Sequence, residues 1–326
     1  MLSSLHPAVI LVLPRFAVLS STLSSAVGLS AALMLGAALP AQTLPHATGI
    51  VHTDAVDIAY ETYGSGGSAL PVICVNGGPG LSRAYMKMST MWFEVARHRL
   101  VVFYDQRGTG ESKRLAPHAP QTLEAQADDL EALRAHLGLD KVALVGDSFG
   151  GWISMAYIAA HPEHVARLVL SDSPGPTWKD TVHLLPQTYP DIEAEDDAAM
   201  KKLGADSDAA ARLSLRNHFR MIFYSPAKRD AYMAAMGNLG YEPAVARAMS
   251  ESAGTHNFTA TLAGIRCPTL VINGRDDMNV APLTAWNMAH AIPGAKLVFF
   301  EESGHLPSYE EPQKYRAVLE DFLNVP

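Results

Sequence analysis

One serine of this chain stands in a short pattern that can make its hydroxyl a nucleophile. Ser148 lies in Gly146-x-Ser148-x-Gly150, directly after the apolar run 142–145 and before residues with a helical pattern. A sharp strand-to-helix turn of this kind pushes a serine hydroxyl out above a sheet, and the glycines let strand and helix pass closely. Asp147 is an alternative nucleophile, but the residues two positions to each side of it are valine and phenylalanine. The pattern therefore predicts that Ser148 attacks a substrate carbonyl.

A serine nucleophile needs a base that takes its proton and an acid that orients the base. Two later apolar runs end in loops that carry such groups, Asp276 and Asp277 in the first and His305 in the second. Because the carboxyl ends of parallel strands meet at one edge of a sheet, these loops are expected to lie near Ser148. The chain order serine, aspartate, histidine favours a catalytic triad of Ser148, His305 and either Asp277 or Asp276. Asp172, which follows another apolar run, is an alternative acid.

A tetrahedral intermediate also needs backbone N–H groups that stabilise its oxyanion. The loop Asn76-Gly77-Gly78-Pro79-Gly80 follows a buried apolar run and carries no bulky side chain over three of its positions. Gly78 and Phe149, the residue after the nucleophile, are the expected donors of the oxyanion hole.

Apolar runs that alternate with helical patterns position these residues. The expected strands are 56–63, 71–75, 100–104, 142–145, 166–170, 268–272 and 295–300, the first of them an edge strand, and the clearest helices are 122–137, 282–291 and 312–323. Strands that are apolar throughout predict an α/β fold with a mostly parallel sheet covered by helices on both faces. Residues 177–262 show only helical patterns, so we expect a helical lid inserted between two strands of a core made of residues 42–176 and 263–326.

Composition narrows the class of protein. Of the 326 residues, 48% are hydrophobic and 18% are charged, which is ordinary for a globular protein. The net charge of -8 argues against a nucleic-acid partner. Two cysteines, Cys74 and Cys267, give neither a disulfide framework nor a zinc spacing. The sequence implies no metal and no organic cofactor.

The first forty residues differ from the rest. Residues 16–39 are rich in alanine, leucine, serine and valine and contain no acidic residue. The segment closes with Ala37-Ala38-Leu39-Pro40-Ala41, which is rich in small residues. This pattern predicts a signal peptide over residues 1–41 and an exported enzyme, periplasmic or secreted, without stable membrane association after cleavage. The alternative is an uncleaved anchor, because residues 16–39 are long enough to span a bilayer.

Five motifs together resemble the proline iminopeptidase (prolyl aminopeptidase) branch of the α/β-hydrolases. They are Asn76-Gly-Gly-Pro-Gly80, Asp105-Gln-Arg-Gly-x-Gly-x-Ser112, the Gly-x-Ser-x-Gly turn, Gly274-Arg-x-Asp277 and Ser303-Gly-His305. In this family the acid commonly stands three residues after the loop glycine, which selects Asp277 over Asp276. The chain departs from the family pattern at Asn76, usually histidine, at Asp147, usually glycine, and at Phe149, usually tryptophan.

The resemblance implies a serine hydrolase that releases N-terminal proline, or another small residue, from short peptides. A carboxylesterase or lactonase with the same machinery is the alternative, and a non-catalytic binding protein is disfavoured by the complete triad. Family members use lid carboxylates to bind the substrate's amine. Among the acidic residues of the lid, Glu242 and Glu251 stand near apolar and aromatic residues and are the predicted substrate-binding pair, whereas the charged run 193–197 is expected to be solvated surface.

Overall fold

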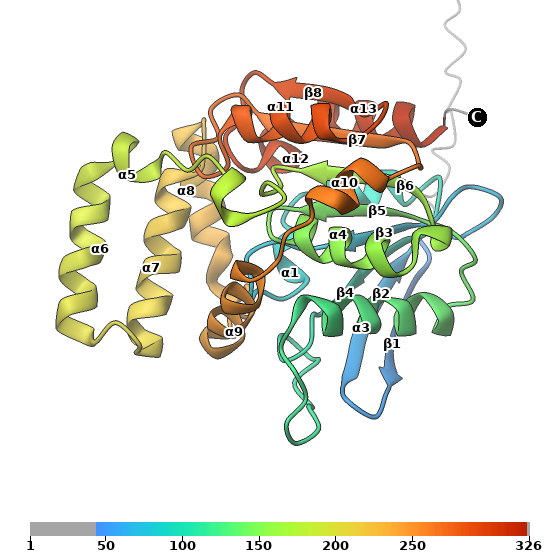
Figure 1. Ribbon diagram of the computed structural model, residues 1–326, viewed down its shortest axis with the longest axis horizontal. Coiled ribbons are helices and arrows are strands. Elements are labelled where there is room, and N and C mark those ends of the chain that lie inside the picture. Colours follow the sequence, from blue (N-terminus) through green and yellow to red (C-terminus); the bar gives the residue numbers. More distant parts are fainter. Residues whose placement is uncertain (1–43, 325–326) are drawn as a thin grey trace, which may run out of the picture. The chain divides into compact units, whose positions relative to one another are not determined.

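The computed structural model describes residues 44–324, so the predicted signal peptide lies outside the described part of the chain. Eight strands form one sheet in the spatial order β1-β2-β4-β3-β5-β6-β7-β8 (Figure 1). The strands are β1 (His46–His52), β2 (Asp57–Tyr63), β3 (Val72–Val75), β4 (Val101–Tyr104), β5 (Val142–Asp147), β6 (Val165–Ser171), β7 (Thr269–Gly274) and β8 (Lys296–Phe300). The last six strands in this spatial order, β4, β3, β5, β6, β7 and β8, are parallel to one another. β2 pairs antiparallel with both β1 and β4. The predicted fold class, an α/β-hydrolase sheet, is confirmed.

The edge of the sheet differs from the prediction. β2 was expected to be the edge strand, but β1 pairs with it along its whole length. Only Val51 of β1 is buried, and most of its residues are exposed. A strand that is solvated on most positions lacks the alternating apolar pattern by which strands are identified in a sequence.

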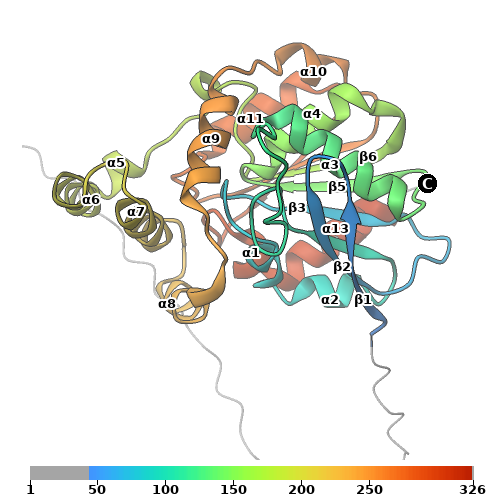
Figure 2. The ribbon, with the colours of Figure 1, turned by 90° about the horizontal axis from the view of Figure 1, so that it is seen from below.

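Helices cover both faces of the sheet because successive side chains of each strand point to opposite sides. In β3, Ile73 and Val75 contribute to one apolar core, and Val72 and Cys74 contribute to the other. The first core includes residues of α3 (Leu123–His136), α4 (Gly150–Ala160) and α11 (Pro282–Ala291). The second includes residues of α1 (Ala84–Lys87), α2 (Met91–Val95) and α13 (Pro312–Asn324), which lie on the opposite side of the sheet (Figure 2).

Between β6 and β7 the chain forms helices alone. They are η2 (Trp178–Asp180), α5 (Leu185–Thr188), α6 (Pro190–Leu203), α7 (Asp208–Met221), α8 (Pro226–Ala235), η3 (Met236–Asn238), α9 (Pro243–Gly254) and α10 (Thr259–Gly264). In both views α6 and α7 lie farthest from the sheet, with α9 between them and the core (Figures 1 and 2). α10 packs against α4 and α11.

A short helix, α12 (Pro307–Glu310), follows β8. No helix within residues 44–324 combines the length and the apolar character that crossing a membrane requires.

Candidate active site

Ser148 lies at the turn between β5 and α4. Its φ angle is 51°, in the left-handed region that a residue with a side chain rarely adopts. A Cβ atom at Gly146 would lie 2.5 Å from Ser154 Oγ and 2.7 Å from the carbonyl oxygen of Gly150. Any side chain at position 146 would collide with these atoms, so only glycine lets the strand and the helix approach each other this closely. The turn therefore holds Ser148 in the strained geometry typical of an exposed nucleophile.

One imidazole joins the serine hydroxyl to a carboxylate. His305 Nε2 lies 2.8 Å from Ser148 Oγ, and His305 Nδ1 lies 2.7 Å from Asp277 Oδ2. Asp277 is fully buried, and its Oδ1 accepts hydrogen bonds from the backbone N–H groups of Asn279 (2.8 Å) and Val280 (2.9 Å). In this arrangement the imidazole can take the serine proton while the carboxylate orients the ring. The structure thus brings together the three residues named from the sequence.

The two alternative acids lie in different surroundings. Asp276 is exposed. Asp172 is buried, and its Oδ1 accepts hydrogen bonds from Asn273 Nδ2 (3.0 Å) and from the backbone N–H of Gly274 (2.9 Å). Burial and the nearby charge of Asp277 raise the pKa of Asp172 well above its usual range. Asp172 therefore supports the loop after β7, and Asp277 is the acid bonded to the imidazole.

Buried carboxyl groups control the protonation of His305. Burial alone would lower its pKa, but the charge and hydrogen bond of Asp277, with the charges of Asp172 and Asp147, outweigh burial and raise the pKa to about 9. The imidazole is therefore mostly protonated at neutral pH in the free protein. The neutral form that can act as a base becomes more abundant as the pH rises.

Asp147 lies on a different side of the turn from the serine hydroxyl. Its carboxylate accepts a hydrogen bond of 2.7 Å from the Tyr85 hydroxyl, and it lines a small cavity of about 10 Å³ with Tyr85 and Tyr232. Burial raises the pKa of Asp147 to about 6, against the opposing effects of His305 and Tyr85. Ser148, by contrast, lines a larger pocket. This placement favours Ser148 over Asp147 as the attacking group.

The predicted oxyanion donors line the same pocket as Ser148. Gly78 has a φ of 55°, which glycine adopts without strain. Phe149 directly precedes α4, where the first backbone N–H groups have no partner within the helix. The Asn76 side chain donates a hydrogen bond of 3.0 Å to the carbonyl of Leu81 and so closes the loop. Asparagine at this position therefore has a structural role in the loop.

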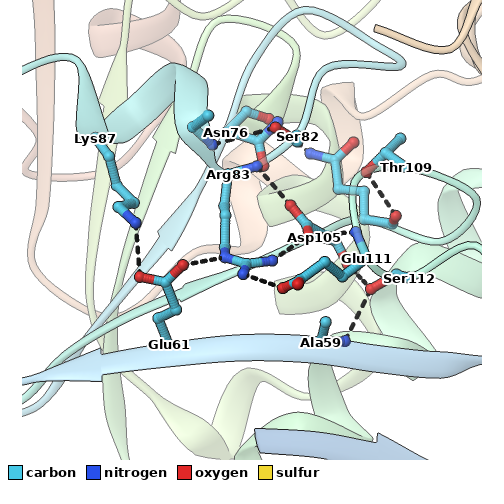
Figure 3. Close-up of polar contacts among 12 residues, drawn as sticks. Ala59, Glu61, Asn76, Ser82, Arg83, Lys87, Asp105, Thr109, Glu111 and Ser112 are labelled. Carbon is cyan, nitrogen blue, oxygen red and sulfur yellow. Dashed lines mark hydrogen bonds and ion pairs between the residues drawn. The ribbon is translucent and has the colours of Figure 1, made fainter. Parts of the chain in front are cut away.

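A network of charged side chains lies next to the oxyanion loop, centred on Arg83. The Arg83 guanidinium contacts the carboxylates of Glu61, Asp105 and Glu111, and Lys87 lies 2.6 Å from Glu61 (Figure 3). The backbone N–H of Arg83 also donates to Asp105 Oδ1 at 2.7 Å. Asp105 is buried, so its charge depends on these partners. The network therefore joins β2, the loop after β3 and the loop after β4.

Residues 105–112 connect these loops to each other and to α3. Gln106 Nε2 donates to the backbone carbonyl of Asn76 at 2.7 Å. Arg107 is buried and makes two hydrogen bonds of 2.7 Å to the two carboxylate oxygens of Asp129 on α3. The segment therefore acts as scaffold, and Arg107 joins the loop after β4 to α3.

Above Ser148 lies a pocket of about 430 Å³. It is bounded by the oxyanion loop, the segment after β6, α7, α9 and the loop after β7, and its lining residues are Gly78, Pro79, Ser148, Phe149, Pro174, Trp178, Thr181, His183, His218, Ser250, Asn279 and Val280. Trp178 packs edge-on against Trp152, with ring centroids 4.6 Å apart, and is 48% exposed. Sequence reasoning missed Trp178, His183 and His218 as lining residues, because each lies in a region without a recognisable motif.

The lid carboxylates predicted to bind an amine do not line this pocket. Glu242 lies 2.8 Å from Lys113 and borders a separate groove. Glu251 is exposed on α9. In the charged run, Glu195 pairs with Arg220 on α7. The prediction for Glu242 and Glu251 relied on apolar neighbours in the sequence, but α9 turns its apolar face to the core and leaves these carboxylates outside the site.

Three side chains of the site could in principle hold a metal ion. Asp172, Asp277 and His305 each offer a ligand atom, and these atoms lie within 4.8 Å of one another. Both nitrogens of His305 are already engaged, by Asp277 and by Ser148. The donor set therefore fits proton transfer better than metal ligation.

Comparison with known proteins is consistent with this geometry. The model of the alpha/beta hydrolase fold family matches residues 71–312. Proline iminopeptidase from Lactobacillus helveticus (strain DPC 4571) is 30% identical over 285 residues, which cover 82% of this chain and 95% of that protein. Proline iminopeptidase from Heyndrickxia coagulans is 30% identical over 281 residues, with coverage of 82% and 95%.

Solved structures agree on the fold. A thermophilic esterase from Thermogutta terrifontis is 25% identical, with a TM-score of 0.66 over 85% of this chain and 98% of that chain. An esterase from Rhodococcus sp. ECU1013 is 22% identical, with a TM-score of 0.69 and coverage of 86% and 98%. The second likeness shows the fold alone.

Proposed function

The chain belongs to the alpha/beta hydrolase fold family, and from this premise we propose that it is a serine hydrolase that releases an N-terminal proline, or another small residue, from short peptides. The observation that carries the reaction type is the chain of hydrogen bonds from Asp277 through His305 to Ser148. Identity of 30% to proline iminopeptidases, over nearly their whole length, supports the peptide substrate.

In the proposed reaction Ser148 Oγ attacks the carbonyl carbon of the N-terminal residue. His305 takes the hydroxyl proton as the bond forms, and Asp277 stabilises the resulting imidazolium. The N–H groups of Gly78 and Phe149 bind the oxyanion. His305 then returns the proton to the leaving amine, so the C–N bond breaks and an acyl-enzyme remains. A water molecule, deprotonated by His305, releases the N-terminal residue and restores Ser148.

A carboxylesterase or lactonase is the second candidate, and one observation favours it. None of the described residues that line the pocket is acidic. A substrate ammonium buried there would have no carboxylate within the pocket, which is costly for a charge removed from water. An ester lacks this charge and makes no such demand on the site.

Acetylation of the substrate's amine separates these two activities. We expect hydrolysis of the free prolyl arylamide to exceed that of its N-acetyl derivative by at least about tenfold in kcat/KM, the value of one hydrogen bond to a charged group. Equal rates on the two substrates would reject the aminopeptidase and favour the esterase. A panel of short-chain esters measured in parallel would then identify the acyl group.

We also propose that the enzyme is exported. The support is the apolar leader with small residues at its end, residues 16–41. N-terminal sequencing of protein from the native host should give a chain that starts near Gln42. A mature chain that keeps the leader would contradict cleavage and favour the membrane anchor.

A further inference from the structure

Most polar side chains of the pocket above Ser148 are already engaged by the protein. Thr181 Oγ1 accepts from the backbone N–H of Gly175 at 3.0 Å. His183 Nδ1 lies 3.0 Å from the carbonyl of Asn279, and Asn279 Nδ2 lies 3.2 Å from His305 Nε2. Each of these groups has a partner that fixes its orientation. Thr181 and Asn279 are therefore less free to bind a substrate, whereas the ring of His183 is held at Nδ1 alone.

His218 lines the pocket beside the catalytic base, and no hydrogen bond from the described part of the chain holds its ring. It lies on α7 and is half-buried. Its ring packs edge-on against the ring of His305, with centroids 6.5 Å apart, and against Phe219 at 6.1 Å. Within residues 44–324 neither nitrogen of His218 makes a hydrogen bond to another side chain or to the backbone. Both nitrogens of this pocket-lining ring are therefore available to a bound substrate.

We propose that His218 is a specificity-determining residue that accepts a hydrogen bond from the N-terminal amine of the substrate. The inference rests on the proposed aminopeptidase function and names the group that replaces the expected lid carboxylates. The amine nitrogen is two bonds from the carbonyl carbon that Ser148 attacks. A ring in contact with His305, the base that itself contacts Ser148, lies on the side of the pocket that this amine can reach.

The protonation state of His218 suits this role. Burial, together with the positive charge that His305 and His183 can carry, lowers the pKa of His218 to about 3. The ring is therefore neutral at neutral pH, with one nitrogen as donor and the other as acceptor. A substrate ammonium can donate to that acceptor, whereas a protonated ring would repel it.

Negative charge near the site offsets the charge of the ammonium. Asp277, Asp172 and Asp147 are all buried, and their charges favour the protonated form of His305. When His305 is neutral, the form that acts as the base, the charge of Asp277 also favours a positive charge on a substrate bound beside that ring. Amine recognition can thus combine a neutral acceptor that lines the pocket with buried carboxylates that do not line it.

The test compares a substrate that has the amine with one that lacks it. For each variant the readout is the ratio of kcat/KM for prolyl p-nitroanilide to kcat/KM for p-nitrophenyl acetate. His218→Phe keeps the ring packing but removes the acceptor, and His218→Leu serves if the phenylalanine does not fold. We expect the ratio to fall at least tenfold in either variant. His218→Gln, which retains an acceptor, should recover part of the ratio.

His183→Phe is the matched control because His183 also lines the pocket but is bonded to Asn279. Its ratio should stay within about threefold of wild type, less than one hydrogen bond to a charged group. An unchanged ratio in His218→Phe and His218→Leu, or an equal fall in His183→Phe, would overturn the assignment to His218. If wild type prefers the free amine and the His218 variants keep that preference, only this inference fails. If wild type shows no such preference, the proposed function fails as well.

Discussion

The two halves of the active site are built differently. On the core side, Ser148, His305 and Asp277 follow three strands of one sheet and are joined by hydrogen bonds of 2.7 and 2.8 Å. On the lid side, helices contribute His218 and Ser250 to the pocket, while the acidic residues predicted to bind substrate lie elsewhere. The triad is thus positioned by the strands of the sheet, whereas the rest of the pocket depends on how helices pack over it.

Apart from loss of the nucleophile itself, the largest expected effect comes from replacing the acid of the triad. Asp277→Asn should lower kcat by about 10³–10⁴-fold, because an amide cannot hold the imidazole in the required tautomer. Asp172→Asn is the matched control: the amide keeps an acceptor oxygen for the N–H groups that bind Asp172 Oδ1, so we expect a change below about tenfold, since Asp172 makes no contact with the reacting atoms. Steady-state kinetics of both variants measure the contrast, and a larger loss in Asp172→Asn would reverse the two roles.

Breaking the charged network of Arg83 in the core should lower the free energy of unfolding more than breaking an ion pair of the lid. Arg83→Met leaves the buried carboxylate of Asp105 without its guanidinium partner, which is expected to cost about 3–5 kcal/mol of unfolding free energy. The control is Arg220→Met in the lid, where both partners of the Arg220–Glu195 pair are partly exposed, and a surface pair of this kind contributes at most about 1 kcal/mol. Urea unfolding gives both values. Equal losses would show that the network is not a scaffold.

The pH dependence should follow His305. The base must be neutral to accept the serine proton, and the pKa of His305 is raised to about 9. Thus kcat/KM should rise with pH until it levels off above about 9. Asp147→Asn removes a negative charge that favours the imidazolium, so the rising limb should move to lower pH, by up to about one unit. A shift to higher pH, or none, would show that Asp147 does not act on His305.

The smallest effect is expected in the lid. Glu242→Gln and Glu251→Gln should each change the preference for a free over an acetylated amine by less than about twofold, because neither carboxylate lines the pocket. The comparison of rates on the two prolyl arylamides measures this. A loss of tenfold or more in either variant would restore the prediction made from the sequence and require the lid to move over the pocket.

The sequence alone indicated most of the core side and little of the lid side. Ser148, Asp277 and His305 each follow an apolar strand, and parallel strands bring such positions to one edge. The family resemblance then selected Asp277 over its neighbour Asp276. β1 was missed because it is largely solvated. His218 had no motif to mark it, since its contact with His305 depends on the packing of α7 over the sheet. The apolar neighbours of Glu242 and Glu251 in the sequence did not reveal which way those side chains face.

The most direct test of the central claim is chemical labelling of the nucleophile. A fluorophosphonate should form one covalent adduct with the purified protein, and peptide mapping should locate it on Ser148, because His305 activates that hydroxyl alone. Ser148→Ala should show no adduct and no hydrolysis while retaining the melting temperature of wild type within a few degrees. An adduct on another residue, or labelling and hydrolysis that persist in Ser148→Ala, would contradict the account.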